Sequence, residues 1–192
     1  MVKQNNPPAI YQIKVTLKET DPLIWRRILV PSNITLHRLH LILQEVMGWT
    51  NSHLYRFMID KNEYSTPDPE NYFDELDCID SKRTKLDFVV TAKGDKFSYE
   101  YDFGDGWEHK LIVEGISEPI AGYSYPVCVK GERNCPPEDC GGPYGFKRLL
   151  GIIANPEHAE YREMIEWLGS GYQPAFFSAE EVNRHLKPIL RL

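Results

Sequence analysis

The sequence has no apolar run long enough to cross a membrane, and its N-terminus lacks the apolar core of a signal peptide. We therefore expect a cytoplasmic location and no membrane partner. An excess of basic residues is also missing, because 22 Lys and Arg stand against 28 Asp and Glu and give a net charge of −6. Such a charge repels phosphate backbones, and the basic doublets Arg26-Arg27 and Lys82-Arg83 are isolated. Nucleic acid is therefore an unfavoured partner.

Established catalytic motifs are absent as well. The chain has no Ser-His-Asp order, nucleophile elbow or zinc-protease helix. The run Asp102-Phe-Gly104 matches the metal-binding tripeptide of kinases, but the other kinase motifs are missing. Asp102, Asp105 and Glu108 recur at every third position, whereas a calcium-binding EF-hand needs oxygens at alternate positions. The sequence therefore names no reaction and leaves open whether the protein is an enzyme.

The composition is that of an ordinary globular protein, with 42% hydrophobic and 26% charged residues in 192. This length fits a single α+β domain over residues 1–192, and the loop-rich stretch 119–143 is the one candidate joint before the C-terminal helices. We expect a mainly antiparallel sheet built from hairpins, one covering helix after the second strand, and a helical C-terminal third.

Local patterns predict the individual elements. Alternation and turn residues predict strands at 11–17, 23–30 and 53–59. Apolar spacing and capping residues predict helices from Thr35 to Gly48, over 144–154, from Asn155 to Gly169, and from the capping box Ser178-Ala-Glu-Glu181 onward. Residues 61–80 read as a long loop with short elements, and 86–90 fits either a short strand or one helical turn.

The most informative segment is Tyr99-Glu-Tyr-Asp-Phe-Gly-Asp-Gly-Trp-Glu-His109, in which two aromatic-rich strands flank a glycine-containing turn. A three-residue loop at 104–106, with Gly106 left-handed, keeps both apolar sets on one face of the hairpin. The predicted cross-strand pairs are Phe103 with Trp107, Tyr101 with His109, Tyr99 with Leu111, Glu100 with Lys110, and Asp102 with Glu108. The last pair is repulsive unless a cation or a donor lies between the carboxylates, and it is a first indication of function.

The carboxylates of this turn also have an ordinary structural interpretation. Aspartates in tight turns commonly accept hydrogen bonds from backbone N–H groups. Asp102 and Asp105 are placed to do so. This interpretation is the favoured one from the sequence.

Three of the four cysteines form a second candidate site. Cys128, Cys135 and Cys140 lie within thirteen residues, and Cys135-Pro-Pro-Glu-Asp-Cys140 has a spacing at the edge of that used for zinc. Zinc is therefore the candidate metal, with a remote fourth ligand. The alternative is that these are small buried thiols in a Pro/Gly turn. A permanent disulfide is disfavoured in the cytoplasm, and the acidic neighbours Glu138 and Asp139 oppose a reactive thiolate.

The histidines give a third candidate. His40, near the apolar stripe of the predicted helix, His53 and His109 can meet if the helix covers an antiparallel sheet. The alternative is that they are hydrogen-bonded core residues.

The distinctive motifs occur in one order along nearly the whole chain: Trp25-Arg-Arg27, Leu39-His40, Gly48-Trp49, His53-Leu54, the 99–109 run and Cys135-Pro-Pro-Glu-Asp-Cys-Gly-Gly142. Together they resemble the Ri-plasmid ORF-three-like family, whose members also appear as passenger proteins of mobile elements. The resemblance implies a single α+β domain with no established activity. It also implies that the two most specific motifs lie together in the fold and form one candidate site, made of Asp102, Asp105, Trp107, His109, Glu138 and Asp139. A resolvase-like role needs an Arg cluster around a nucleophilic Ser and a basic DNA-binding helix, and this acidic chain shows neither.

These observations favour a non-enzymatic module that binds an unidentified protein or small ligand where the 102–109 turn meets the 135–142 loop. The first alternative is a metal-assisted hydrolase with Asp102, His109 and a cysteine or Glu138 as metal ligands and Asp139 as the base. A second alternative gives the thiols or metal a purely structural role, with the interaction surface elsewhere. An accessory protein for mobile-element DNA transactions ranks last on charge.

Overall fold

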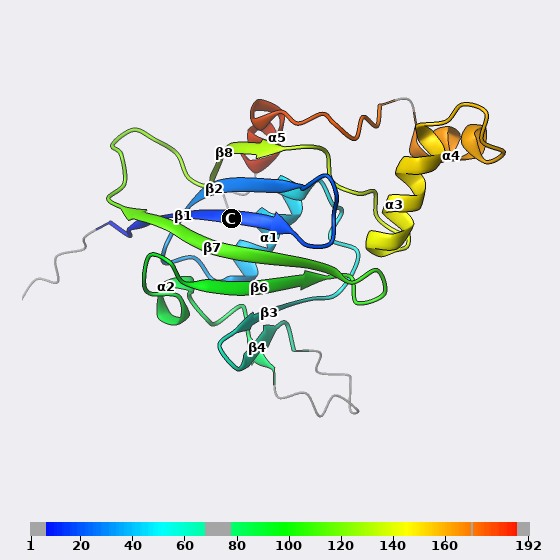
Figure 1. Cartoon of the computed structure of the whole chain (residues 1–192). Helices are drawn as coiled ribbons and strands as arrows, with labels where there is room; N and C mark the ends of the chain where they lie inside the picture. The colour runs from blue at the N-terminus through cyan, green and yellow to red at the C-terminus, as the bar shows by residue number, and fades with distance from the viewer. Residues whose placement is uncertain (1–6, 68–77, 170, 188–192) are drawn as a thin grey trace, which may run out of the picture.

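A mostly antiparallel sheet forms the centre of the protein (Figure 1). The computed structural model describes residues 7–67, 78–169 and 171–187. Within them the strands are β1 (Ile10–Leu17), β2 (Trp25–Pro31), β3 (Tyr55–Ile59), β4 (Asn62–Ser65), β5 (Ile79–Asp80), β6 (Lys96–Tyr101), β7 (Trp107–Ser117) and β8 (Val127–Glu132). They are ordered β5-β4-β3-β6-β7-β1-β2-β8, and only the β4–β5 pair is parallel.

The helices of the described residues are α1 (Leu36–Met47), α2 (Leu86–Val89), α3 (Gly142–Ile153), α4 (Tyr161–Leu168) and α5 (Ala179–Leu186). Helix α1 lies behind the sheet in Figure 1, α5 packs against α1 and β8, and α3 and α4 lie beyond one end of the sheet. The predicted α+β class, with one covering helix after the second strand, is confirmed. None of these helices has the length and apolarity that a membrane crossing requires.

The core lies between the sheet and α1. The alternate residues Ile13, Val15 and Leu17 of β1 are fully buried, as are Leu39 and Leu43 of α1. These are the apolar positions of the predicted strand and helix, with periods of two and about 3.6 residues. Burial of this aliphatic surface stabilises the fold by about 25 cal/mol for each Å² removed from water.

The ends of α1 are also as predicted. The side chain of Thr35 accepts a hydrogen bond from the backbone N–H of Arg38 at 3.1 Å. Gly48 adopts a left-handed conformation with φ of 85°, and its N–H bonds back to the carbonyl of Gln44. The chain therefore leaves the helix at Gly48 and turns toward Trp49 and the start of β3.

The hairpin of β6 and β7 has a different register from the predicted one. Tyr101 lies opposite Trp107 and Tyr99 lies opposite His109, so the loop spans five residues, 102–106, rather than three. The cause is Asp102, whose side chain accepts bonds from the N–H groups at 104 and 105 and whose carbonyl accepts one from Gly106. Gly106 is left-handed, as expected, with φ of 69°.

This shift of two residues preserves which residues face the core but changes the neighbours. Phe103, expected to pair with Trp107 in the core, is 47% exposed. Glu108 lies opposite Glu100 rather than Asp102. Because the register differs, the predicted repulsive pair of Asp102 and Glu108 does not form, and Lys18 bonds to Glu108 at 2.5 Å.

The C-terminal part agrees with prediction in some places and differs in others. Ser178 caps α5 by accepting a bond from the N–H of Glu181, as predicted. Helix α4 begins at Tyr161 and not at Asn155, because the Asn155 side chain accepts a bond from the N–H of Glu157 and closes a turn. Strand β8 was not predicted, and it extends the sheet by pairing with β2.

The two segments left undecided by the sequence also have defined structure. Residues 86–89 form the short helix α2 rather than a strand. Strands β4 and β5 lie within the predicted loop 61–80, of which residues 68–77 fall outside the described residues.

Candidate functional site

Three loops meet at one end of the sheet and form what we call the corner, made of residues 49–54, 102–106 and 136–141. The turn between β6 and β7 and the beginning of α3 lie at the same end in Figure 1. The indole N–H of Trp49 donates to the carbonyl of Pro136 at 3.0 Å, and the N–H of Gly141 donates to the Asp105 carboxylate at 3.2 Å. The 102–106 turn therefore does contact the cysteine-containing loop.

Glu138 links two of these loops to the sheet. Its carboxylate accepts hydrogen bonds from the N–H of Thr50 at 3.1 Å, from the Thr50 hydroxyl at 2.5 Å, and from the Tyr101 hydroxyl at 2.5 Å. The Tyr101 oxygen in turn accepts a bond from the N–H of Ser52. Burial and the adjacent carboxylate raise the pKa of Tyr101, so this phenol stays protonated and serves as a donor. Glu138 is thus engaged in holding the corner together.

His53 lies between two carboxylates of the corner. Its Nδ1 atom is 3.6 Å from Oδ1 of Asp102, and its Nε2 atom is 3.4 Å from Oδ1 of Asp139. The side chain of Asp102 is 9% exposed, that of His53 29%, and that of Asp139 75%. The three ligand atoms lie within 4.8 Å of one another, and no other set of three His, Cys, Asp or Glu groups in the described residues does so.

Beside this group is a cavity of about 190 Å³. Asp139 and Cys140 border it from the corner, and Arg148, Met164 and Trp167 border it from α3 and α4. Arg148 forms an ion pair with Glu160. Asp139 therefore belongs both to the histidine–carboxylate group and to the wall of an adjoining cavity.

Comparison with known proteins assigns the chain to a family. The family model described as plasmid pRiA4b ORF-3-like protein matches residues 9–181. The chain belongs to this family. It is 40% identical over 178 residues to the uncharacterized protein y4hQ of Sinorhizobium fredii (strain NBRC 101917 / NGR234), covering 92% of this chain and 90% of the relative. It also matches the crystal structure of MM3350, a protein of unknown function from Methanosarcina mazei Go1, with a TM-score of 0.82 and 32% identity over 90% of this chain and 97% of that one.

The two family motifs do not contribute all their residues to the corner surface. Trp107 and His109 are fully buried in the core, although the sequence placed both at the site. Nδ1 of His109 is 3.3 Å from the carbonyl oxygen of Tyr99, and burial lowers the pKa of His109 to about 4. His109 is therefore a neutral core residue that does not join the group around His53.

The predicted cluster of His40, His53 and His109 also does not form. His40 is buried and bonds to the Tyr99 hydroxyl at 2.8 Å and to Asn51 at 2.7 Å. His53 was therefore grouped with the wrong partners. The feature that could have identified His53 as a candidate site residue is its position in the loop that follows the C-cap of α1 and faces the 102–106 turn.

The three cysteines have separate surroundings and do not form a ligand set in the described part of the chain. The sulfur of Cys135 accepts a bond from Arg26 at 3.2 Å, and that of Cys128 lies 3.7 Å from the carbonyl of Lys130. Burial raises the pKa of Cys128 to about 11 and that of Cys140 to about 12, and it also raises that of Cys135. The geometry therefore matches the alternative of buried thiols better than it matches a zinc site.

Proposed function

We propose that this protein is a binding module that takes a small ligand at the corner through His53, Asp102 and Asp139. The observation that carries the proposal is a difference in bonding within the corner. Glu138 accepts three hydrogen bonds from the protein itself, whereas the His53 contacts of 3.4 and 3.6 Å are long for hydrogen bonds. The His53 ring and the Asp139 carboxylate therefore keep bonding capacity for a ligand, whereas Oδ1 of Asp102 already accepts bonds from the N–H groups at 104 and 105.

The chemistry of the group indicates the kind of ligand. Two carboxylates face one imidazole, so the group favours a positively charged or hydrogen-bond-donating head. The adjoining cavity offers the thioether of Met164 and the indole of Trp167 to an apolar body. A small primary amine with an aliphatic or aromatic body fits both parts.

The test is a titration of isotope-labelled protein with a panel of such amines, followed by backbone NMR. We expect shifts confined to the 50–54, 102–106 and 138–141 segments and to the parts of α3 and α4 around Arg148, Met164 and Trp167, and a loss of affinity of about tenfold in Asp139→Asn. Asp60→Asn, in the turn after β3, is the matched control and should bind as the parent does. Absence of shifts in the corner, or equal affinity of Asp139→Asn and the parent, would show that the proposal is wrong.

A metal-assisted hydrolase is the second candidate, and the spacing of the same three groups favours it. One imidazole nitrogen and two carboxylate oxygens within 4.8 Å suit a first-row divalent cation and leave positions for water and substrate. Here His53 and Asp139 replace the predicted His109 and Glu138 as ligands, because His109 is buried in the core and Glu138 is engaged by Thr50 and Tyr101.

Metal content by mass spectrometry on untagged protein purified without chelator tests this candidate. We expect about one equivalent of metal that His53→Ala loses and that Cys135→Ser and His185→Ala keep. Hydrolysis of chromogenic esters or phosphates should follow the same pattern. Loss of metal in Cys135→Ser alone would show that the cysteines bind the metal instead. A protein that takes up no metal would contradict the proposal of a metal-assisted hydrolase.

A further inference from the structure

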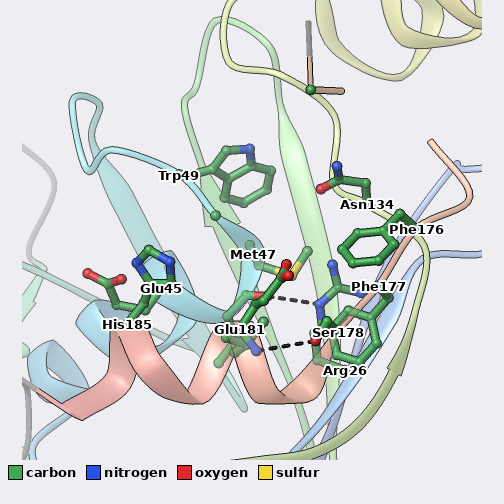
Figure 2. A pocket seen from close by; sticks show the side chains of 14 residues that line it. Arg26, Glu45, Met47, Trp49, Asn134, Phe176, Phe177, Ser178, Glu181 and His185 are labelled. Carbon is green, nitrogen blue, oxygen red and sulfur yellow. Dashed lines mark hydrogen bonds between the residues drawn. The ribbon is translucent and has the colours of Figure 1, made fainter. Parts of the chain in front are cut away.

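A larger cavity, which shares Trp49 with the corner, lies between α1, α5 and the segment that precedes α5 (Figure 2). Its volume of about 400 Å³ falls within the range of about 300–1,000 Å³ that is usual for small-molecule sites. The indole of Trp49 and the ring of Phe176 line it, and Met47 lies between them. Phe176 is 45% exposed, so the cavity opens to solvent on that side.

A buried positive charge borders this cavity. Arg26 is 2% exposed and uses four of its five N–H donors within the protein. These bonds go to the carbonyl oxygens of Val46, Trp25 and Glu132 and to the sulfur of Cys135. In the described part of the chain no carboxylate oxygen lies within 4.0 Å of the Arg26 guanidinium nitrogens, the distance that defines an ion pair. A buried guanidinium without a counter-charge is costly, and an anionic group in the cavity supplies one.

Asn134 adds a second donor on the same side. Its Oδ1 accepts a bond from the N–H of Cys135, while its side-chain amide N–H groups have no partner among the described residues. Arg26, Asn134 and Phe176 lie together on one side of the cavity in Figure 2. A carboxylate is the ligand group that both donors favour.

The opposite side carries negative charge. Glu45 and His185 lie together there, and Glu181 projects from α5 between the two sides (Figure 2). Within residues 7–67, 78–169 and 171–187 the Glu45 carboxylate has no ion-pair or hydrogen-bond partner. Among the same residues, the Glu181 carboxylate contacts only Arg184, at 3.8 Å. The carboxylates of Glu45 and Glu181 repel a simple anion and attract an ammonium group.

We propose that this cavity binds a free α-amino acid with an apolar side chain. Its carboxylate bonds to Arg26 and Asn134, its ammonium group lies near Glu45 and Glu181, and its side chain packs against Trp49 and Phe176. A zwitterion satisfies both sides of the cavity at once, which neither an anion nor a cation alone can do. The aromatic wall of Trp49, which is 6% exposed, covers the ligand on the side away from solvent.

The test is calorimetric titration with the common amino acids and, for the best binder, with its deaminated acid and its decarboxylated amine. We expect saturable binding of one or more apolar amino acids and a loss of about tenfold in affinity for each truncated analogue, since each lacks one charge-assisted contact. Equal affinity of an analogue and the amino acid overturns the proposal, and so does the absence of saturable binding across the panel.

Variants locate the binding without disturbing the fold. Glu45→Gln should weaken the amino acid about tenfold and leave the deaminated acid unaffected. Asn134→Asp keeps the oxygen that bonds Cys135 but places a negative charge beside the ligand carboxylate, and it should abolish binding. Glu180→Gln, on the exposed surface of α5, is the matched control. Unchanged affinity in both Glu45→Gln and Asn134→Asp would overturn the proposal, whereas Asp139→Asn should have no effect because it belongs to the corner.

Discussion

Two histidines of this protein, His40 and His53, have opposite surroundings. His40 is buried, stacks on Tyr55 with ring centroids 3.5 Å apart, and uses both nitrogens in bonds to Tyr99 and Asn51. His53 lies in a loop, is 29% exposed, and contacts its carboxylates only at 3.4 Å or more. The difference teaches that a concentration of titratable residues does not mark a site. In the described residues the His40 ring has both nitrogens bonded, whereas neither nitrogen of the His53 ring is within hydrogen-bonding distance of a partner.

The largest expected effect concerns the buried histidines and pH. Burial lowers the pKa of His40 to about 3 and that of His109 to about 4, whereas an unfolded imidazole titrates near 6.5. As pH falls below about 6.5, the unfolded chain binds protons that the folded chain does not, so the free energy of unfolding decreases. For each buried imidazole, the free energy of unfolding falls by about 1.4 kcal/mol per pH unit until the pH reaches the pKa of that imidazole in the folded protein. Above about pH 6.5 the stabilising contribution of each imidazole is fully present.

Urea titrations at about pH 7.5 and about pH 5 measure this dependence. A His40→Gln variant should show a shallower slope because only His109 then contributes. Equal free energies of unfolding at the two pH values would contradict the assignment of both histidines as neutral core residues.

The next largest effect is expected for Tyr99→Phe. The Tyr99 hydroxyl accepts a bond from Gln44 at 2.9 Å and contacts Nδ1 of His40 at 2.8 Å, and all three side chains are buried. Removing it leaves two buried polar groups without a partner, which should destabilise the protein by about 3 kcal/mol. Urea unfolding measures the loss, and Tyr144→Phe, at an 82% exposed position, should leave stability unchanged.

A smaller effect is expected at Glu138, which connects the loops of the corner. Glu138→Gln replaces a carboxylate that accepts three bonds by an amide with one acceptor, in a partly exposed place. We expect a loss of about 1–2 kcal/mol in the free energy of unfolding. Asp139→Asn is the neighbouring control, and a loss of similar size there would mean that the two acidic residues are equally structural.

The smallest effect is expected for His53→Asn. The His53 contacts of 3.4 and 3.6 Å are longer than hydrogen bonds, so this variant should unfold within about 0.5 kcal/mol of the parent. Its ligand or metal binding should nevertheless be lost. If the free energy of unfolding of His53→Asn fell as far as that of Tyr99→Phe, His53 would be a structural residue like His40, and the proposed difference between the two histidines would be wrong.

The sequence was sufficient where one local pattern decides the structure. The alternation in β1, the Thr35 cap, the Gly48 terminus and the Ser178 capping box each follow from neighbouring residues. The register of the β6–β7 hairpin did not follow, because a shift of two residues keeps the same faces buried. Only the side chain of Asp102, by closing the turn early, separates the two registers.

The candidate site was predictable only in part. The contact between the 102–106 turn and the cysteine loop was expected from two motifs, and the structure brings those segments together. The roles inside it were not predictable, since burial decides them. Trp107 and His109 face the core. Glu138 accepts a bond from Thr50, which is far from it in the sequence, and His53 lies 3.4 Å from Asp139, which is also far from it in the sequence.

The junction between the turn and α3 carries a constraint that concerns other sequences. Gly142 has a φ of 66°, and a Cβ at this position would lie 2.3 Å from the carbonyl oxygen of Asp105. Any side chain there would push the turn away from the start of α3, whereas the side chain of His53 can change with the backbone intact. Asp139, with a φ of 58°, can be replaced without backbone strain mainly by Asn or Gly. A search for the same corner in distant genomes should therefore require this glycine first and allow the charged positions to vary with the ligand.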